Sequence, residues 1–359
     1  MLDFLNTWLA NGGFWVAIPL IIVGCAALIK GADFLVDGAS ALAKKYGVSD
    51  IVIGLTVVAF GTSMPEFVVN MVAVGQGSTE IAITNVLGSN IINIFVILGF
   101  TALIFPISSQ KSTRRFDIPF SLLAALLVLL FAIYNSPSWL QIEHIFNMNI
   151  ADPTLSDLGS IQMGQGNGGF ISGVGGSILL IFFLIFLWHN FKGIGSAPQT
   201  ESNEEYKPMS ARRALALIIG GLIGLVVGGE VIVKSATSIA QSLGVSDAII
   251  GLTVVALGTS LPELATSCMA AFKKNCDIAL GNVVGSNLFN IFFILGTSAC
   301  VKALPGYHGL EIDAMMAALG SIFVMLFVYL TKKHEIKRWH GAILLLTYAA
   351  YLAYRIITL

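Results

Sequence analysis

Apolar residues fall into long runs along the chain, and short polar segments separate these runs. A helix of about 20 apolar residues can cross a bilayer, because each residue adds about 1.5 Å along the axis. By this criterion the pattern predicts ten membrane-spanning helices, at 13–43, 48–75, 79–104, 116–135, 171–190, 211–240, 246–272, 278–302, 312–331 and 339–357. We therefore expect an all-α polytopic membrane protein whose surroundings are a lipid bilayer.

The composition supports a membrane protein and narrows its partners. Charged residues make up 11 % of the 359 residues and apolar residues 56 %, whereas soluble domains carry about 25 % charged residues. The net charge of −1 argues against a nucleic-acid partner, because binding a phosphate backbone requires clustered cations. No feature of the sequence indicates an obligate protein partner.

The basic residues predict the orientation of the chain. Fifteen of the 19 lysines and arginines lie in the segments that follow the first, third, fifth, seventh and ninth predicted helices. Loops rich in lysine and arginine stay in the cytoplasm. We therefore expect a multi-pass protein of the cell (inner or plasma) membrane with both termini outside.

The chain contains an internal duplication. Residues 31–99 align without a gap to residues 228–296, and 34 of the 69 aligned pairs are identical. The second copy begins five helices after the first, and an odd number of crossings reverses the orientation. The sequence therefore predicts two inverted five-helix repeats, 1–190 and 211–359, joined by a cytoplasmic linker at 191–210. Inverted repeats are typical of secondary transporters that bind substrate near the membrane midplane.

Two glutamates lie deep within apolar runs, one in each copy. Of the predicted helices that carry or follow Glu66 and Glu263, only 278–302 contains a lysine or arginine, and that residue, Lys302, is its last. Intramembrane carboxylates of this kind usually mark an ion pathway. Pro65 and Pro262 directly precede the glutamates, and each proline removes a backbone N–H and so breaks its helix. The carbonyl oxygens that lose their partners must then find another, and a cation can serve.

Neutral oxygen-bearing residues share faces with the two glutamates. Within each copy they are spaced three or four residues apart on two successive helices, which places them on one helix face. The candidate ion ligands are Ala59, Thr62, Ser63, Glu66, Ser89, Asn93, Ala256, Thr259, Ser260, Glu263, Ser286 and Asn290. Such hard oxygen ligands favour Ca²⁺ and Na⁺, whereas zinc or copper prefers cysteine or histidine. The sequence contains no protease or ATPase motif, so we expect a transporter of Ca²⁺ and Na⁺, without a cofactor, and no enzyme.

Other charged residues in the spans have a simpler interpretation. Asp33 and Asp37 are four residues apart with Lys30 beside them, and Glu230 and Lys234 are also four apart. Helix surfaces commonly carry such pairs, so we interpret them as solvated helix ends or local ion pairs.

The paired motifs resemble those of a known family. The Gly-Thr-Ser-x-Pro-Glu segments that end at Glu66 and Glu263, and the Gly-Ser-Asn-x-x-Asn-Ile segments that begin at Gly88 and Gly285, resemble the α-repeats of the sodium/calcium exchanger family, which belongs to the calcium:cation antiporter superfamily. The resemblance is to a prokaryotic-type member, because the 191–210 linker is too short to fold as the regulatory domain of animal members.

This resemblance implies a function and a role for each candidate ligand. The family exchanges Na⁺ for Ca²⁺ by alternating access, in which the first and sixth helices slide across the others. The same twelve residues would form the ion sites, with the two alanines acting through their backbone carbonyls. Exchange of three Na⁺ for one Ca²⁺ would be electrogenic.

The resemblance also bears on potassium. The potassium-dependent branch carries an aspartate 27 residues after the acidic residue of the second repeat, and this chain has Asn290 there. We therefore expect K⁺-independent transport. Two alternatives stay open: a proton-coupled Ca²⁺/cation antiporter that uses the same carboxylates and, with less support, a cation channel.

Overall fold

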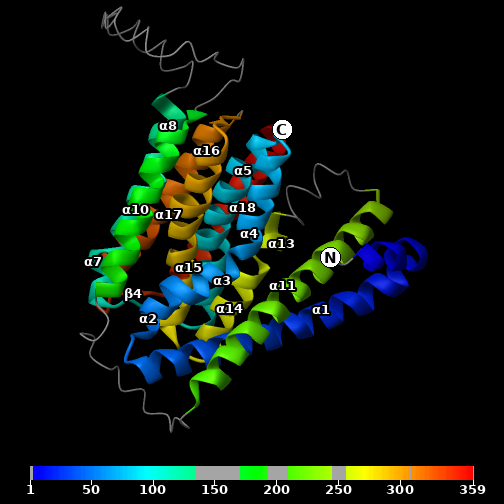
Figure 1. The fold of residues 1–359 in the computed structure, drawn as a ribbon, viewed down its shortest axis with the longest axis horizontal. Helices are drawn as coiled ribbons and strands as arrows, with labels where there is room; N and C mark the ends of the chain where they lie inside the picture. The colour runs from blue at the N-terminus through cyan, green and yellow to red at the C-terminus, as the bar shows by residue number, and fades with distance from the viewer. Residues whose placement is uncertain (1–2, 135–169, 193–208, 245–255, 308, 359) are drawn as a thin grey trace, which may run out of the picture.

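The computed structural model describes residues 3–134, 170–192, 209–244, 256–307 and 309–358. Most of these residues lie in helices that pack side by side (Figure 1). The expected all-α architecture is thereby confirmed. The predicted loop between the fourth and fifth helices and most of the predicted linker lie outside the described residues.

Eight described helices are long and apolar enough to cross a membrane. They are Phe14–Tyr46, Thr79–Ile104, Lys111–Ile133, Gly173–Lys192, Ala211–Ser242, Cys276–Val301, Leu310–Leu330 and Arg338–Ile357. A ninth candidate is the pair Asp50–Thr62 and Met64–Gly75, which is bent by 45°. These nine match nine of the ten predicted spans. The first part of the remaining one, predicted at 246–272, lies outside the described residues.

The elements follow one another in two series. The first series is α1 (Asp3–Tyr46), α2 (Asp50–Ile53), η1 (Gly54–Val58), α3 (Ala59–Thr62), α4 (Met64–Gly75), α5 (Thr79–Ile92), η2 (Asn93–Leu98), α6 (Gly99–Ile104), β1 (Ile107–Ser108), α7 (Lys111–Arg115), α8 (Asp117–Tyr134), β2 (Phe170–Ile171) and α10 (Gly173–Lys192). The second is α11 (Ala211–Ser242), α13 (Ala256–Thr259), α14 (Leu261–Phe272), α15 (Cys276–Leu288), η5 (Phe289–Leu295), α16 (Gly296–Val301), β3 (Leu304–Pro305), α17 (Leu310–Leu330), β4 (Glu335–Ile336) and α18 (Arg338–Thr358).

The duplication in the sequence recurs in these boundaries. Helices α13, α14 and α15 begin 197 residues after α3, α4 and α5, which is the offset between the two sequence copies. The segments η1, η2 and η5 are π-helical. Short π-helical segments within longer helices often occur at functional sites, and here they adjoin the candidate ion ligands.

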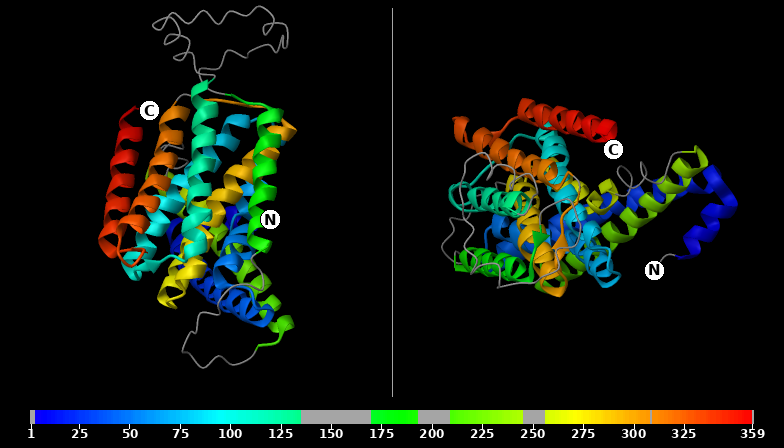
Figure 2. Two further views of the ribbon diagram at one scale, coloured as in Figure 1. Left: turned by 90° about the vertical axis from the view of Figure 1, so that its left-hand side faces the viewer. Right: turned by 90° about the horizontal axis from the view of Figure 1, so that it is seen from above.

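Helices α1 and α11 lie side by side, at an angle to the other helices (Figures 1 and 2). Glycines allow their backbones to approach closely. A Cβ atom at Gly31 would lie 2.8 Å from the carbonyl oxygen of Gly221, and one at Gly221 would lie 2.7 Å from that of Gly31. Small residues permit this kind of helix contact within membranes, where lipid is as apolar as a leucine side chain.

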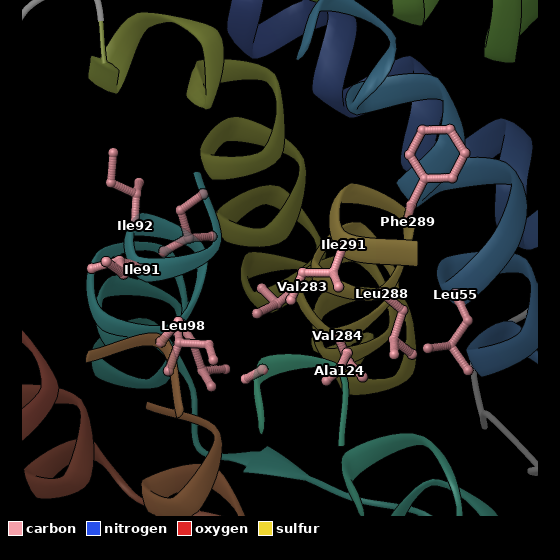
Figure 3. Close-up of a cluster of buried hydrophobic side chains, with 14 of the residues drawn as sticks. Leu55, Ile91, Ile92, Leu98, Ala124, Val283, Val284, Leu288, Phe289 and Ile291 are labelled. Atoms are coloured by element: carbon pink, nitrogen blue, oxygen red, sulfur yellow. The ribbon is translucent and has the colours of Figure 1, made fainter. Parts of the chain in front are cut away.

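The spans α5–α6 and α15–α16 form the centre of the molecule. They are the most buried of the candidate spans, whereas α1 and α18 are largely exposed. Figure 3 shows part of the apolar cluster around them, including Ile91 of α5, Leu288 of α15 and Leu55 of η1. The break between α3 and α4, and that between α13 and α14, lie in elements that pack against this centre.

Two short antiparallel ladders join the ends of helices. Strand β1 pairs with β4, and β2 pairs with β3. Each strand has only two residues, too few to show an alternating pattern, so the sequence did not predict them.

Candidate ion site

Each candidate site glutamate lies directly after a helix break. A single residue, Ser63, separates α3 from α4, and Ser260 separates α13 from α14. Pro65 and Pro262 are at the first turns of α4 and α14, where the missing N–H of a proline is tolerated. The break predicted from the prolines is therefore observed in both repeats, and Glu66 and Glu263 lie in the first turns of the helices that follow.

The two glutamates are buried together. Each is 1 % exposed, and Ser63, three residues before Glu66, forms a hydrogen bond with Glu263. Among the described residues, neither forms an ion pair with a lysine, arginine or histidine. A buried charge without a partner is strongly unfavourable, so this pair requires cations or protons to balance it.

A hydrogen bond brings the two repeats together at the glutamates. The Ser63 hydroxyl donates to Oε1 of Glu263 over 2.8 Å. The neighbouring Thr62 hydroxyl lies 3.1 Å from Oδ1 of Asn282. Residues about 200 positions apart, one from each sequence copy, therefore line one region.

Many oxygen atoms in this region lack a hydrogen-bond partner. Of the fourteen buried side-chain atoms without one in the described part of the chain, nine belong to the predicted ligands. They are both carboxylate oxygens of Glu66, Oε2 of Glu263, the hydroxyls of Ser89, Thr259, Ser260 and Ser286, and Oδ1 of Asn93 and Asn290. Buried polar atoms are normally hydrogen-bonded. This concentration of unpaired oxygens provides the donor set that a desolvated cation needs.

The two predicted alanine ligands differ from the rest. The carbonyl oxygen of Ala59 accepts the backbone N–H of Ser63 at 3.0 Å and lies 3.3 Å from the Thr62 hydroxyl. It is therefore the least available of the predicted first-repeat ligands in this arrangement. Ala256 begins α13, and its side chain lies outside the described residues.

The site contains few charged ligands. In the described ranges there is no group of three or more histidine, cysteine, aspartate or glutamate residues that could hold a metal ion. Two carboxylates with neutral hydroxyl and amide oxygens suit Ca²⁺ or Na⁺ better than a transition metal. With only two carboxylates, the site would bind a cation without holding it too tightly for release.

Sequence reasoning missed several asparagines beside the site. Asn282 contacts Thr62, and its Nδ2 donates to Oγ of Ser267 at 2.9 Å and to the carbonyl of Glu263 at 3.3 Å. Asn90 and Asn287 hydrogen-bond to predicted ligands of the opposite repeat. A signal existed, because each of these asparagines has an identical counterpart in the other sequence copy.

Comparison with known proteins agrees with this arrangement. A sequence model described as sodium/calcium exchanger protein matches residues 16–192 and 213–357. The sodium/calcium exchanger MaX1 of Methanosarcina acetivorans is 33 % identical over 351 residues, covering 93 % of this chain and 96 % of that protein. The sodium/potassium/calcium exchanger 2 of Rattus norvegicus is 32 % identical over only 132 residues, which cover 36 % of this chain and 19 % of that protein.

A solved structure also matches this chain in sequence and in fold. The sodium-calcium exchanger NCX_Mj, in crystals soaked with Na⁺ and Sr²⁺, matches with a TM-score of 0.74 and 32 % identity over 94 % of this chain and 98 % of that one. Sequence and fold thus agree over nearly the whole length. The chain belongs to the sodium/calcium exchanger family, whose members are multi-pass membrane antiporters rather than enzymes.

Proposed function

We propose that this chain is a secondary active antiporter that exchanges Na⁺ for Ca²⁺ by alternating access. One observation carries the proposal: nine buried oxygen atoms without hydrogen-bond partners gather in residues around Glu66 and Glu263. In this proposal all twelve predicted residues line the ion sites, and the two alanines contribute backbone carbonyls.

The proposed architecture has ten membrane helices in two inverted five-helix repeats. The repeats span 1–190 and 211–359, the 191–210 linker is cytoplasmic, and both termini are outside. The recurring helix boundaries support the duplication, and the distribution of lysine and arginine supports the orientation. Sliding of the first and sixth helices across the others would open the same site first to one side of the membrane and then to the other.

Charge balance makes the proposed exchange electrogenic. Two ionised glutamates give the site a charge of −2, which one Ca²⁺ neutralises. Three Na⁺, the number that the family resemblance implies, would leave it at +1. Moving one elementary charge across 100 mV is worth about 2.3 kcal/mol, so the membrane potential would contribute to the driving force.

Transport is proposed to be independent of K⁺. Asn93 and Asn290 supply amide oxygens at positions where an additional carboxylate could hold another monovalent cation. Without that charge, K⁺ has no evident partner in the site.

Uptake of radiolabelled Ca²⁺ into proteoliposomes tests the proposal. An outward Na⁺ gradient should drive Ca²⁺ uptake. Because three Na⁺ leave for each Ca²⁺ that enters, an inside-positive potential should speed uptake and an inside-negative potential should slow it. Replacement of K⁺ by choline should leave uptake unchanged. Uptake that follows a pH gradient and ignores Na⁺ would instead establish the proton-coupled alternative. Ca²⁺ flux without any counter-ion would establish a channel.

A further inference from the structure

Four asparagines connect the two repeats in the centre of the molecule, and only two of them are predicted ion ligands. Asn90 lies in α5 and Asn287 in α15, each three residues before a predicted ligand, Asn93 or Asn290. All four are at most 3 % exposed. We call Asn90 and Asn287 the clamp asparagines.

The clamp asparagines bind each other through the backbone. Nδ2 of Asn90 donates to the carbonyl oxygen of Asn287 at 3.3 Å, and Nδ2 of Asn287 donates to that of Asn90 at 3.4 Å. A carbonyl oxygen has two lone pairs, so each can accept this bond in addition to a helical one. The two bonds are reciprocal and join corresponding positions of the two repeats.

Each clamp asparagine also holds a predicted ligand of the opposite repeat. Oδ1 of Asn287 accepts Nδ2 of Asn93 at 2.9 Å, and Oδ1 of Asn90 accepts Nδ2 of Asn290 at 3.0 Å. The amide nitrogens of both ligands are therefore engaged. The side-chain oxygens of these ligands, Oδ1 of Asn93 and Oδ1 of Asn290, are buried and have no hydrogen-bond partner.

This arrangement has a chemical consequence for a cation site. An asparagine side chain presents either an oxygen or an NH₂ group, depending on how its amide is rotated, and only the oxygen can bind a cation. The clamp oxygen can accept a hydrogen bond only from the NH₂ group. It therefore selects the rotation that leaves the oxygen of the ligand free.

From these contacts we propose that Asn90 and Asn287 are positioning residues, which fix the amide orientation of Asn290 and Asn93 and so present their oxygens to the transported cation. The inference rests on the proposed function. It adds that each repeat sets the orientation of a ligand in the other, so that ion affinity in one half depends on a residue of the opposite half.

A double-mutant cycle on the purified full-length protein tests this cross-repeat action. The readout is the Ca²⁺ concentration that gives half of the maximal rise in melting temperature, which reports binding without transport. Asn287→Leu keeps the volume of the side chain and removes the acceptor for Asn93. We expect it to raise that concentration about tenfold, the effect of losing one hydrogen bond that orders a buried ligand.

The decisive result is which pairs of substitutions have additive effects on Ca²⁺ binding and which do not. If Asn287 acts through Asn93, Asn287→Leu should add little to the effect of Asn93→Ala, whereas it should multiply with the effect of Asn290→Ala. Asn90→Leu should instead add little to the effect of Asn290→Ala and multiply with the effect of Asn93→Ala. A purely structural role for the clamp would lower the melting temperature without ions and would leave the Ca²⁺ dependence unchanged.

Controls separate the possible failures. Ser298→Ala removes a buried hydroxyl without a partner from α16, outside the proposed site, and should leave the Ca²⁺ dependence unchanged. If Asn287→Leu does not fold, Asn287→Ser removes the same acceptor with a side chain too short to reach Asn93.

Two outcomes overturn different claims. A wild-type protein that Ca²⁺ does not stabilise would contradict the proposed function itself. If Ca²⁺ stabilises the wild type and Asn93→Ala weakens this effect, while the clamp variants behave like Ser298→Ala or combine equally with both ligand variants, only the positioning role is wrong.

Discussion

The two halves of the site carry the same residues but make different contacts. In the first repeat, the hydroxyls of Thr62 and Ser63 reach an amide and a carboxylate of the second repeat. Ser260, the counterpart of Ser63, has no hydrogen-bond partner among the described residues, whereas Thr259 lies close enough to Glu66 to interact with its carboxylate. The two near-identical halves therefore make different contacts in this structure, as the proposed alternating access would require.

A similar difference exists where α1 and α11 meet the rest of the protein. Nζ of Lys273, which follows α14, lies 2.6 Å from carboxylate oxygens of both Asp33 and Asp37 of α1. At the equivalent position in α11, Glu230 instead pairs with Lys234 of the same helix at 3.1 Å. We infer that α1 is held to the central helices in this arrangement by a contact that the repeat does not reproduce on α11.

The largest expected effect comes from removing either glutamate charge. Glu66→Gln and Glu263→Gln keep the side-chain shape, but one carboxylate cannot balance a divalent ion in a buried site. Each variant should lose Na⁺-driven Ca²⁺ uptake by at least about a hundredfold, since breaking a buried charge pair costs about 3–5 kcal/mol. Glu80→Gln, at an exposed glutamate of α5, is the matched control. Near-normal uptake by either site variant would show that its glutamate is not a ligand.

Substitution of the equivalent serines, Ser63 and Ser260, tests the difference in contacts between the two halves of the site. Ser63→Ala removes a hydrogen bond to Glu263, and bonds to charged groups contribute about 1.5–3 kcal/mol. Thermal unfolding without Na⁺ or Ca²⁺ should therefore begin at a lower temperature in Ser63→Ala than in Ser260→Ala, whose serine has no such bond. Both variants should lose part of the stabilisation by Ca²⁺. Equal melting temperatures without ions would contradict the difference between the halves.

Removing the contact between Lys273 and α1 should shift the conformational equilibrium away from the arrangement described here. Lys273→Gln should reduce the population of the arrangement described here about two- to fivefold, because partly exposed ion pairs contribute only about 0.2–1 kcal/mol each. Spin labels on α1 and α15 would measure that population as a distance distribution. The adjacent exposed Lys274→Gln serves as the control. An unchanged distribution in Lys273→Gln would show that the contact does not bias the two arrangements.

The smallest expected effect concerns potassium. Asn290→Asp adds up to one negative charge and should make Na⁺-driven Ca²⁺ uptake sensitive to K⁺ by about two- to threefold, the effect of well under 1 kcal/mol. Asn93→Asp, at the equivalent position of the first repeat, shows whether the position or only the charge matters. Wild-type uptake that collapses when choline replaces K⁺, and recovers on addition of K⁺, would overturn the proposed independence.

The sequence predicted the fold and the centre of the site better than the contacts between repeats. The length of the apolar runs predicted nine spans that the structure describes, and Pro65 and Pro262 predicted the helix breaks. Periodicity assigns residues to a face of their own helix, but it does not say which helix of the other repeat that face meets. The bonds from Thr62 to Asn282 and from Asn93 to Asn287 were therefore not predictable.

The charged pairs illustrate the same limit. The interpretation of Asp33 and Lys30 as a local pair agrees with their separation of 3.6 Å. The shorter contact from Asp33 to Lys273 was missed, because 240 residues separate the two in the sequence. Only the packing of α1 against α14 brings them together.

Anomalous X-ray diffraction from crystals of this protein soaked with Sr²⁺, a heavier stand-in for Ca²⁺, would locate the divalent-ion site. We expect one strong anomalous peak that contacts carboxylate oxygens of both Glu66 and Glu263, and the loss of that peak in Glu66→Gln crystals. A strong peak elsewhere in the membrane-spanning region, with none between the two glutamates, would contradict this expectation.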